Sequence, residues 1–433
     1  MSEISVVILA AGLGTRMKSD APKVMFNISG VSMIRHVLAR AYELTNDVSV
    51  VLFHQKELIE KHILDEFKDT KIYTQDLKNY PGTAGALKGI KFGGKKVLVT
   101  CGDMPLITTD ELRNLCEINA DIAMSSFIAN DPFGYGRVIE ENGKVTGIIE
   151  QKDANEAQKQ IKRVNAGTYC FKREILELIL PKIDNKNAQN EYYLTDTIKI
   201  ANELGLNCVA SDVCEHNFMG INDKFQLSIA ESLMQDKIKQ NLMKQGVLMR
   251  LANTIYIDAR AKFFGECVIE ENVSIIGTCQ ITNSHIKSGS VIESSEISHS
   301  DIGPLAHIRP ESKIINTHIG NFVEVKKGVL NGVKAGHLSY LGDCEIDTGT
   351  NVGCGTITCN YDGIKKHKTI VGKNVFIGSD TQLVAPVNIG DDVLIAAGST
   401  ITSDVPSGAL AISRGKQQNK EGFFYKFFGR KNA

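Results

Sequence analysis

The sequence has almost no surplus of charge of either sign. Its 49 lysine and arginine residues are balanced by 50 aspartate and glutamate residues, so the formal net charge is −1. A balanced chain has no global field that would attract nucleic acid or an anionic membrane, and small-molecule substrates fit it better. The sequence also lacks any uninterrupted apolar run of about eighteen residues, the length that a membrane-spanning helix needs. We therefore expect a soluble chain that binds no nucleic acid.

The ten cysteines are scattered, and no two of them form a CxxC pair. The sequence therefore gives no sign of a CxxC metal or redox motif, and we expect reduced thiols. Residues 1–11 have no basic segment ahead of their short apolar run, so no secretory signal peptide is predicted. Both features favour a cytoplasmic location.

Apolar residues are plentiful enough for more than one core. The chain has 433 residues, of which 42% are hydrophobic, and this combination predicts several domains. Residues 223–246 contain no proline and place apolar residues at helical spacing among charged ones, with Gly246 at the end. We therefore expect one domain at 1–222, a linker helix within 223–250, and a second domain with a C-terminal tail at 251–433.

An apolar strand that runs into a glycine-rich loop begins the first domain. Residues 4–9 form an aliphatic run of strand length. The loop after it is built of small residues that let backbone N–H groups approach a phosphate: Ala10, Ala11, Gly12 and Gly14. Arg16 and Lys23 then supply two cations suited to a triphosphate. An ordinary strand-turn-helix connection is the alternative, but it would not require these cations.

Aliphatic runs alternate with helical patterns through the rest of the first domain. The runs at 48–52, 96–100 and 122–126 are strand candidates, and the alternation predicts a mostly parallel α/β sheet. Asp103 follows the run at 96–100, and open α/β sheets bind ligands at the carboxyl ends of their strands. A carboxylate there could hold Mg²⁺ against a triphosphate, although an aspartate can also serve simply as a turn residue.

An aliphatic residue recurs every six positions in the second domain. The period is clearest at six residues: Val371, Ile377, Leu383, Ile389, Ile395 and Ile401. Shorter runs at 257–281 and 302–314 keep the same period, with slips of one residue between them. Three hexads can close a triangular coil, and stacked coils bury a ladder of aliphatic side chains. The pattern resembles a left-handed parallel β-helix.

Polar residues between 309 and 368 exceed what stacking of the coils requires. The hexads are interrupted at 360–368, which indicates a basic loop outside the coil, and loops on rigid scaffolds commonly bind ligands. His337 lies in the same region and could act as a general base, because its unperturbed pKa is near physiological pH. A structural histidine is the alternative.

The stretch LAAGLGTRM at 9–17, followed by Pro22-Lys23, resembles the signature of sugar-nucleotide pyrophosphorylases, which join a nucleoside triphosphate to a sugar 1-phosphate. The resemblance implies catalytic roles for Arg16 and Lys23 and Mg²⁺ ligation by Asp103 and Asn222. It also implies a nucleotide-binding set for UTP: Leu9, Ala11, Gly12, Lys23, Gln75, Gly82 and Thr83. The reading of uracil by Gln75, Gly82 and Thr83 comes from the family, since Pro81 and an apparent insertion blur that alignment.

The sugar side of the first domain resembles the same family through GYGR at 134–137, GIIEQKDA, VNAGTY and NEYYLTD. The resemblance implies an N-acetylhexosamine phosphate pocket: Gly136, Glu150, Asn165, Thr195 and Asn222. Cys101 departs from the family, which often has a tyrosine before this Gly-Asp pair. We therefore expect one contact to be missing at Cys101.

Residues 9–414 resemble a bacterial family of bifunctional N-acetylglucosamine-1-phosphate uridyltransferases and glucosamine-1-phosphate N-acetyltransferases. The resemblance implies that His337 takes the amine proton, and we expect Glu324 to orient it. It implies a site for glucosamine 1-phosphate: Arg309, Lys326, Tyr340, Asn351 and Lys366. It implies an acetyl-CoA side, in which the N–H of Cys354 meets the oxyanion: Cys354, Asn360, Tyr361, Ser379, Ala397 and Arg414.

The resemblance therefore implies two reactions that make a precursor of cell wall and lipopolysaccharide. Acetyl-CoA acetylates glucosamine 1-phosphate, and the product then reacts with UTP to give UDP-N-acetylglucosamine and pyrophosphate. A homotrimer with shared acetyl sites is also implied, and we expect the aromatic and basic tail from Gly422 to pack on a neighbouring β-helix rather than on a membrane. Two alternatives are a single-function pyrophosphorylase for glucose or mannose 1-phosphate and a catalytically inactive regulatory scaffold that binds nucleotide.

Overall fold

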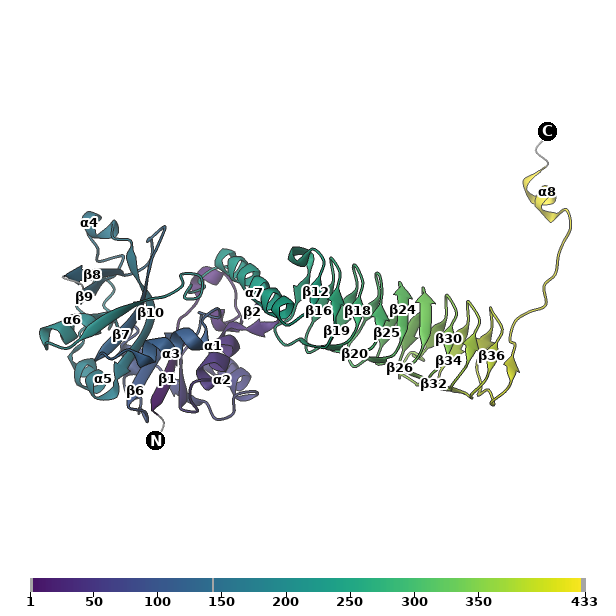
Figure 1. The fold of residues 1–433 in the computed structure, drawn as a ribbon, viewed down its shortest axis with the longest axis horizontal. Helices are drawn as coiled ribbons and strands as arrows, with labels where there is room; N and C mark the ends of the chain where they lie inside the picture. Colours follow the sequence, from purple (N-terminus) through teal and green to yellow (C-terminus); the bar gives the residue numbers. More distant parts are fainter. Residues whose placement is uncertain (1–2, 142–143, 430–433) are drawn as a thin grey trace. The chain divides into compact units, whose positions relative to one another are not determined.

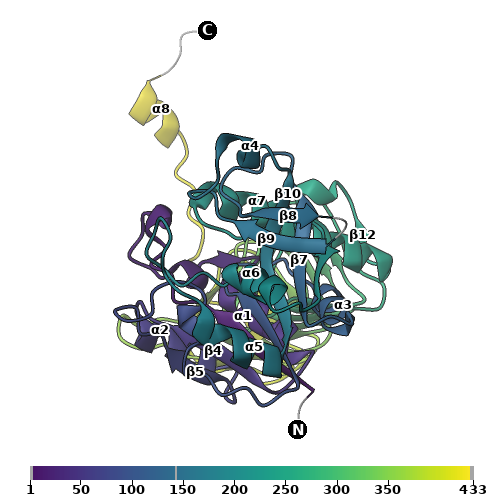
Figure 2. The same cartoon turned by 90° about the vertical axis from the view of Figure 1, so that its left-hand side faces the viewer.

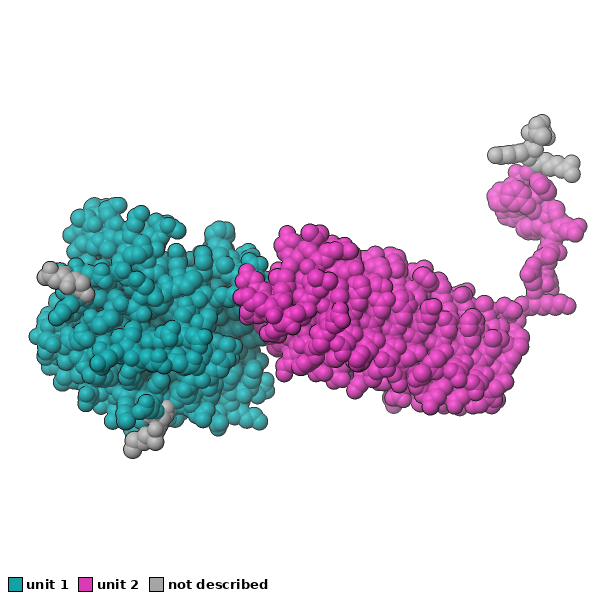
Figure 3. All heavy atoms as spheres, viewed as in Figure 1, with its two compact units in different colours: residues 1–237 teal, residues 238–433 magenta. Residues whose placement is uncertain are grey.

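The computed structural model describes residues 3–141 and 144–429 (Figure 1). The chain divides into two compact units, unit 1 at 1–237 and unit 2 at 238–433 (Figure 3). The boundary falls inside helix α7 (Lys224–Lys244), which is the helix expected from the pattern at 223–246. No helix in the described part of the chain is both long enough and apolar enough to cross a membrane.

Unit 1 is built on a nine-stranded sheet in which strands β11-β7-β10-β6-β1-β4-β5 are neighbours in that order. The bounds are β1 (Ile4–Leu9), β4 (Val48–Leu52), β5 (Lys71–Thr74), β6 (Lys96–Cys101), β7 (Ile122–Ile128), β10 (Arg163–Lys172) and β11 (Cys208–Asp212). Strands β5, β4, β1 and β6 are parallel, whereas β10 is antiparallel to β6 and β7. A hairpin of β8 (Arg137–Glu141) and β9 (Lys144–Ile149) is attached to β10 and lies near α4 (Glu156–Lys159), as Figures 1 and 2 show. A smaller hairpin pairs β2 (Asn27–Ile28) with β3 (Val31–Ser32).

Helices cover both faces of this sheet. Side chains alternate between the faces of a strand, so Val6 and Ile8 of β1 are buried in one core and Val7 in another. The first core is covered by α1 (Met33–Tyr42), α2 (Lys56–Leu64) and α3 (Thr109–Glu117), and the second by α5 (Arg173–Ile179) and α6 (Asp196–Glu203). This is a three-layer α/β fold, and the loops after β1 and β6 emerge at the same sheet edge.

Unit 2 is a left-handed parallel β-helix whose coils are built from three sheets. Sheet C contains β12 (Leu248–Met249), β15 (Val268–Ile269), β18 (His285–Ile286), β21 (Asp301–Ile302), β24 (His318–Asn321), β27 (Lys334–His337), β30 (Asn351–Val352), β33 (Phe376–Ile377), β36 (Leu394–Ile395) and β38 (Leu410–Ala411). Sheet D contains β13 (Tyr256–Ile257), β16 (Ser274–Ile276), β19 (Val291–Glu293), β22 (His307–Ile308), β25 (Glu324–Lys326), β28 (Tyr340–Gly342), β31 (Ile357–Cys359), β34 (Gln382–Val384) and β37 (Thr400–Ile401). Sheet E contains β14 (Lys262–Phe264), β17 (Gln280–Thr282), β20 (Glu296–Ser298), β23 (Lys313–Ile315), β26 (Val329–Asn331), β29 (Cys344–Ile346), β32 (Thr369–Val371) and β35 (Val387–Ile389). A short helix, α8 (Phe423–Phe428), lies in the tail.

The hexad periodicity corresponds to the core of this β-helix. All six residues of the clearest run, from Val371 to Ile401, are buried in one continuous cluster. The slips in the period are coil corners shortened by one residue, as between Ile281 and Ile286, which are both fully buried. The prediction of a β-helix from aliphatic spacing is therefore confirmed.

We expect Ile308→Ala to destabilise the β-helix by about 3 kcal/mol, because a fully buried side chain is replaced by a cavity that the stacked coils cannot close. Denaturant unfolding of the full-length protein, followed through the transition of unit 2, measures this loss. Ile276→Ala is the control, since Ile276 is on the same sheet and 41% exposed, and it should cost less than about 1 kcal/mol. Equal losses in the two variants would contradict the assignment of Ile308 to the core.

Candidate active sites

A cavity of about 500 Å³ opens in unit 1 where β1 and β6 end. Its lining includes the whole predicted nucleotide set: Leu9, Ala11, Gly12, Lys23, Gln75, Gly82 and Thr83. Arg16, Asp103 and Asn222 also line it. The volume is in the range of small-molecule sites, and its backbone-rich wall suits a polyphosphate.

The glycine-rich loop folds back against Lys23. Gly14 has a φ of 63°, and a Cβ added to it would lie 2.8 Å from Lys23 Cβ. Only glycine avoids both the backbone strain and this contact. Gly12 has open space where its side chain would be, so the loop backbone at that point is accessible to a ligand.

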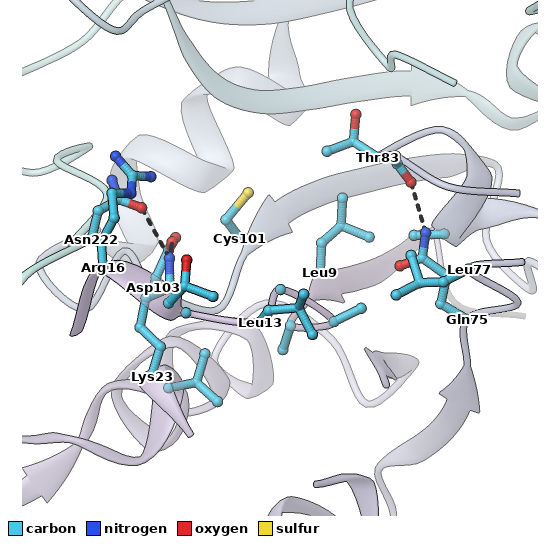
Figure 4. Close-up of a pocket in the computed structure, with 18 of the residues that line it drawn as sticks. Leu9, Leu13, Arg16, Lys23, Gln75, Leu77, Thr83, Cys101, Asp103 and Asn222 are labelled. Atoms are coloured by element: carbon cyan, nitrogen blue, oxygen red, sulfur yellow. Dashed lines mark hydrogen bonds and ion pairs between the residues drawn. The ribbon is translucent and has the colours of Figure 1, made fainter. Parts of the chain in front are cut away.

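Lys23, Asp103 and Asn222 meet at one end of the cavity (Figure 4). The Lys23 ammonium forms an ion pair with Asp103 Oδ2 and donates a hydrogen bond to Asn222 Oδ1 at 3.1 Å. The backbone N–H of Asn222 donates a hydrogen bond to Gln226 Oε1 at 2.7 Å, which holds Asn222 in place. A carboxylate and an amide oxygen are ligands that Mg²⁺ prefers, and here a side-chain cation already contacts both.

The side-chain oxygens of Asp103 and Asn222 form an open site that does not enclose a metal ion on all sides. Within the described residues, no group of three or more His, Cys, Asp or Glu side chains could enclose a metal ion. Mg²⁺ commonly takes one or two protein ligands and completes its shell with phosphate and water. The residues present therefore fit Mg²⁺ that arrives with a nucleotide.

The opposite end of the cavity is formed by a loop fixed to the segment 192–194. Gln75 Nε2 donates to the carbonyl oxygens of Tyr80 at 3.1 Å and Gly82 at 2.8 Å. Thr83 Oγ1 accepts the N–H of Leu194 at 2.9 Å. Gln75 and Thr83 lie together at this end in Figure 4. The lining also contains residues that the sequence analysis did not single out, among them Leu77 and Glu191. Glu191 belongs to the NEYYLTD motif, so the sequence contained a signal that could have identified it. Leu77 lies in the segment where an apparent insertion makes the alignment with the family unclear.

The predicted sugar residues gather around the partly buried carboxylate of Glu150. Glu150 Oε1 accepts a hydrogen bond from Thr195 Oγ1 at 3.1 Å. The Asn165 N–H donates to the Gly136 carbonyl at 2.8 Å, and a Cβ on Gly136 would lie 3.5 Å from both Glu150 carboxylate oxygens. Burial raises the pKa of Glu150. The structure thus brings Gly136, Glu150, Asn165 and Thr195 together, although none of them is among the residues that line the nucleotide cavity.

Three cations converge on sheet D of the β-helix. The Arg309 N–H donates to the Val325 carbonyl, which places Arg309 and Lys326 side by side on adjacent coils. Lys366 approaches from the loop at 360–368, and its ammonium lowers the pKa of Lys326. Two carboxylates lie among these three cations, since Glu324 is paired with Arg309 and Asp343 Oδ2 lies 3.9 Å from Lys366 Nζ. One positive charge is left over, and it favours a bound anion such as a sugar phosphate.

Glu324 does not contact His337. Its Oε1 accepts a hydrogen bond from Arg309 Nη1 at 2.8 Å, and no hydrogen bond joins Glu324 to His337 among the described residues. Glu324 is on β25 of sheet D, whereas His337 ends β27 of sheet C. Within one chain the carboxylate of Glu324 is therefore paired with Arg309, and its role in orienting His337 stays a prediction.

The predicted acetyl-CoA residues follow one corner of the β-helix from coil to coil. The Gly355 N–H donates to the Leu338 carbonyl, next to His337. In the following coils the Asp380 N–H donates to the Cys354 carbonyl, the Gly398 N–H donates to the Ser379 carbonyl, and Arg414 Nη1 donates to the Ala397 carbonyl at 2.7 Å. His337 therefore lies on the same corner of the β-helix as four of the predicted acetyl-CoA residues: Cys354, Ser379, Ala397 and Arg414.

The remaining predicted residues lie on two different faces. Asn360 Nδ2 donates to the Tyr340 hydroxyl at 3.4 Å on sheet D, and the exposed Tyr361 lies in the loop at 360–368. Asn351 begins β30 on sheet C, in register with Lys334 and Phe376. Asn351 and Tyr340 are therefore on separate faces of one chain.

Comparison with known proteins gives matches for both units. The MobA-like NTP transferase domain family matches residues 6–139, and the bacterial transferase hexapeptide family (six repeats) matches residues 368–403. The chain is 72% identical to the bifunctional protein GlmU of Campylobacter curvus over 433 residues, which are 100% of both chains. It is 72% identical to the bifunctional protein GlmU of Campylobacter concisus over 98% of both chains, and 61% identical to that of Campylobacter fetus over 99% of both. The chain therefore belongs to the GlmU family of bifunctional proteins.

Proposed function

We propose that this chain makes UDP-N-acetylglucosamine from glucosamine 1-phosphate in two reactions at two separate sites. Unit 2 acetylates the sugar amine with acetyl-CoA, and unit 1 then transfers a uridylyl group from UTP. The observation that carries the proposal is that one chain contains both a nucleotide cavity with Lys23, Asp103 and Asn222 and a β-helix that carries a cluster of Arg309, Lys326 and Lys366 as well as His337.

In unit 1, the phosphate oxygen of N-acetylglucosamine 1-phosphate attacks the α-phosphorus of UTP, and pyrophosphate leaves. The entering triphosphate competes with Asp103 for the Lys23 ammonium, so Lys23 is free to neutralise phosphate charge together with Arg16. Asp103 and Asn222 would hold Mg²⁺, which supplies further charge neutralisation when bound. Glu150, Asn165 and Thr195 orient the sugar.

In unit 2, Arg309, Lys326 and Lys366 hold the phosphate of glucosamine 1-phosphate. His337 is exposed at the coil corner and takes a proton from the amine as the nitrogen attacks the thioester carbonyl. The backbone N–H of Cys354 stabilises the oxyanion. CoA leaves as the thiol after taking a proton from His337, and N-acetylglucosamine 1-phosphate is released.

We also propose a cytoplasmic homotrimer in which copies share the acetyl site. The support is that Asn351 is on sheet C while Tyr340 and the cation cluster are on sheet D, so one chain presents the sugar-binding residues on two faces. A second copy could close the site between such faces. Sedimentation at assay concentration tests this proposal, and a fully active monomer would refute shared sites.

The direct test incubates the purified protein with glucosamine 1-phosphate, acetyl-CoA, UTP and Mg²⁺. Free CoA thiol and UDP-N-acetylglucosamine are followed, and both should appear. Omission of Mg²⁺ should stop only the nucleotide product. Turnover of N-acetylglucosamine 1-phosphate without acetyl transfer would indicate a single-function pyrophosphorylase, and no turnover in folded protein would indicate a nucleotide-binding scaffold.

A further inference from the structure

A loop outside the coils of the β-helix carries Lys366, one of the three cations proposed to hold the sugar phosphate. The loop at 360–368 folds as a small hairpin, since Tyr361 and Lys366 form an antiparallel bridge. Its turn is fixed by Asp362, whose Oδ1 accepts two backbone N–H groups of the turn at 2.7 and 2.6 Å. The hairpin is therefore held together internally, and the position of its base decides where the Lys366 ammonium lies.

Asp343 joins the two ends of this loop. It lies at the corner between β28 and β29, and its Oδ2 accepts a hydrogen bond from Asn360 Nδ2 at 2.5 Å where the loop begins. Its carbonyl oxygen accepts the Thr369 N–H at 3.2 Å directly after the loop ends. Asn360 is 6% exposed, and the only other acceptor that its Nδ2 reaches within the described residues is the Tyr340 hydroxyl at 3.4 Å. The buried amide at the base of the loop therefore depends on the Asp343 carboxylate.

The same carboxylate faces the cation at the other end of the hairpin. Asp343 Oδ2 is 3.9 Å from Lys366 Nζ, and the Asp343 side chain is 19% exposed, so water screens their attraction less than at an open surface. The Asp343 N–H donates to the Lys326 carbonyl at 2.8 Å, so Asp343 stands one coil away from Lys326. Asp343 is thus placed to offset the repulsion between two lysines that a phosphate would have to bring together.

We propose that Asp343 is a positioning residue of the acetyl-transfer site, whose carboxylate closes the base of the loop at 360–368 and holds the Lys366 ammonium where the phosphate of glucosamine 1-phosphate binds. This inference rests on the proposed acetyl transfer. Asp343 acts through Lys366 and does not itself contact the sugar. His337 ends β27 on another sheet, so loss of Asp343 should weaken binding of the sugar phosphate and leave the chemical step nearly intact.

Asp343→Gly removes the carboxylate without straining the backbone, because Asp343 has a φ of 48° and glycine adopts this left-handed conformation readily. The KM for glucosamine 1-phosphate should rise about tenfold, while kcat at saturating acetyl-CoA should stay within about twofold of the wild-type value. The stabilisation of unit 2 by glucosamine 1-phosphate in thermal unfolding should become smaller. Amide hydrogen exchange in the loop at 360–368 should become faster, since the base of the loop is released.

Asp343→Asn separates the two functions of the carboxylate. Asparagine also tolerates the left-handed conformation and keeps an oxygen that can accept the Asn360 amide, but it loses the charge that faces Lys366. We expect an intermediate rise in the KM for glucosamine 1-phosphate, about threefold. If Asp343→Gly does not fold, Asp343→Asn carries the same test.

The control is Asp392→Gly, at a different corner of the β-helix. Asp392 has a φ of 58°, and its Oδ1 accepts a hydrogen bond from Asn374 Nδ2 at 3.2 Å, so the substitution removes a similar contact from a similar backbone conformation. It should change neither the KM for glucosamine 1-phosphate nor hydrogen exchange in the loop at 360–368.

An unchanged KM in folded Asp343→Gly would overturn the proposal, and so would a lower KM, because the carboxylate would then oppose the phosphate. An equal rise in KM for Asp392→Gly would also overturn it, since the effect would be one of general stability. A wild-type protein that does not acetylate glucosamine 1-phosphate would instead refute the proposed acetyl transfer itself.

Discussion

Asp103→Asn should reduce uridylyl transfer by about three orders of magnitude or more and leave acetyl transfer at the wild-type rate. The substitution keeps the shape of the side chain but removes the carboxylate of Asp103, which pairs with Lys23 in the nucleotide cavity. Phosphoryl transfer depends on positioning and on neutralisation of charge, so loss of the carboxylate that we propose as a ligand of Mg²⁺ should remove most of the stabilisation. Pyrophosphate release and CoA thiol release, measured on one preparation, give the two rates separately.

Asp110→Asn is the matched control for this substitution. Asp110 lies in the same unit, and its side chain is 85% exposed in a surface ion pair with Arg113. The control should change neither rate, since exposed ion pairs contribute little. A near-normal uridylyl rate for folded Asp103→Asn would remove Asp103 from the metal site, and loss of both activities would contradict independent sites.

His337→Ala should slow acetyl transfer by about two to four orders of magnitude, because proton transfer by a positioned base contributes a factor of this size. His337 is exposed at the end of β27, so its removal leaves no cavity in the buried core of the β-helix. CoA thiol release at saturating acetyl-CoA measures the rate. Uridylyl transfer from supplied N-acetylglucosamine 1-phosphate should remain at the wild-type rate.

The control for His337 is His299→Asn, which replaces another exposed histidine of the β-helix. His299 has a φ of 49°, and asparagine tolerates this left-handed conformation well. This variant should acetylate at the wild-type rate. A near-normal rate for His337→Ala would show that another group, or water, takes the amine proton.

The elements with strong local patterns could be predicted from the sequence. The aliphatic run at 4–9 is strand β1, and the hexads from Val371 to Ile401 are core positions of the β-helix. Both follow from short-range periodicity, which depends on the rise and turn of the backbone. The antiparallel insertion of β10 between β6 and β7 could not be predicted in this way, because strand order depends on contacts between distant segments.

Glu324 shows where residue type alone was insufficient. Glu324 is expected to orient His337 because a carboxylate partner fixes the tautomer of an imidazole. In the β-helix, however, Glu324 accepts a hydrogen bond from Arg309 on sheet D, whereas His337 ends a strand of sheet C.

The sequence by itself determined the glycine-rich nucleotide loop, the β-helix and the family, because each is encoded in residues close together along the chain. Only the tertiary structure decided which distant groups meet. Lys23 contacts Asp103 and Asn222 across 80 and 199 residues, and Thr195 donates to Glu150 across 45 residues. Such contacts depend on how strands and loops pack, and packing is a property of the whole folded chain rather than of any local pattern.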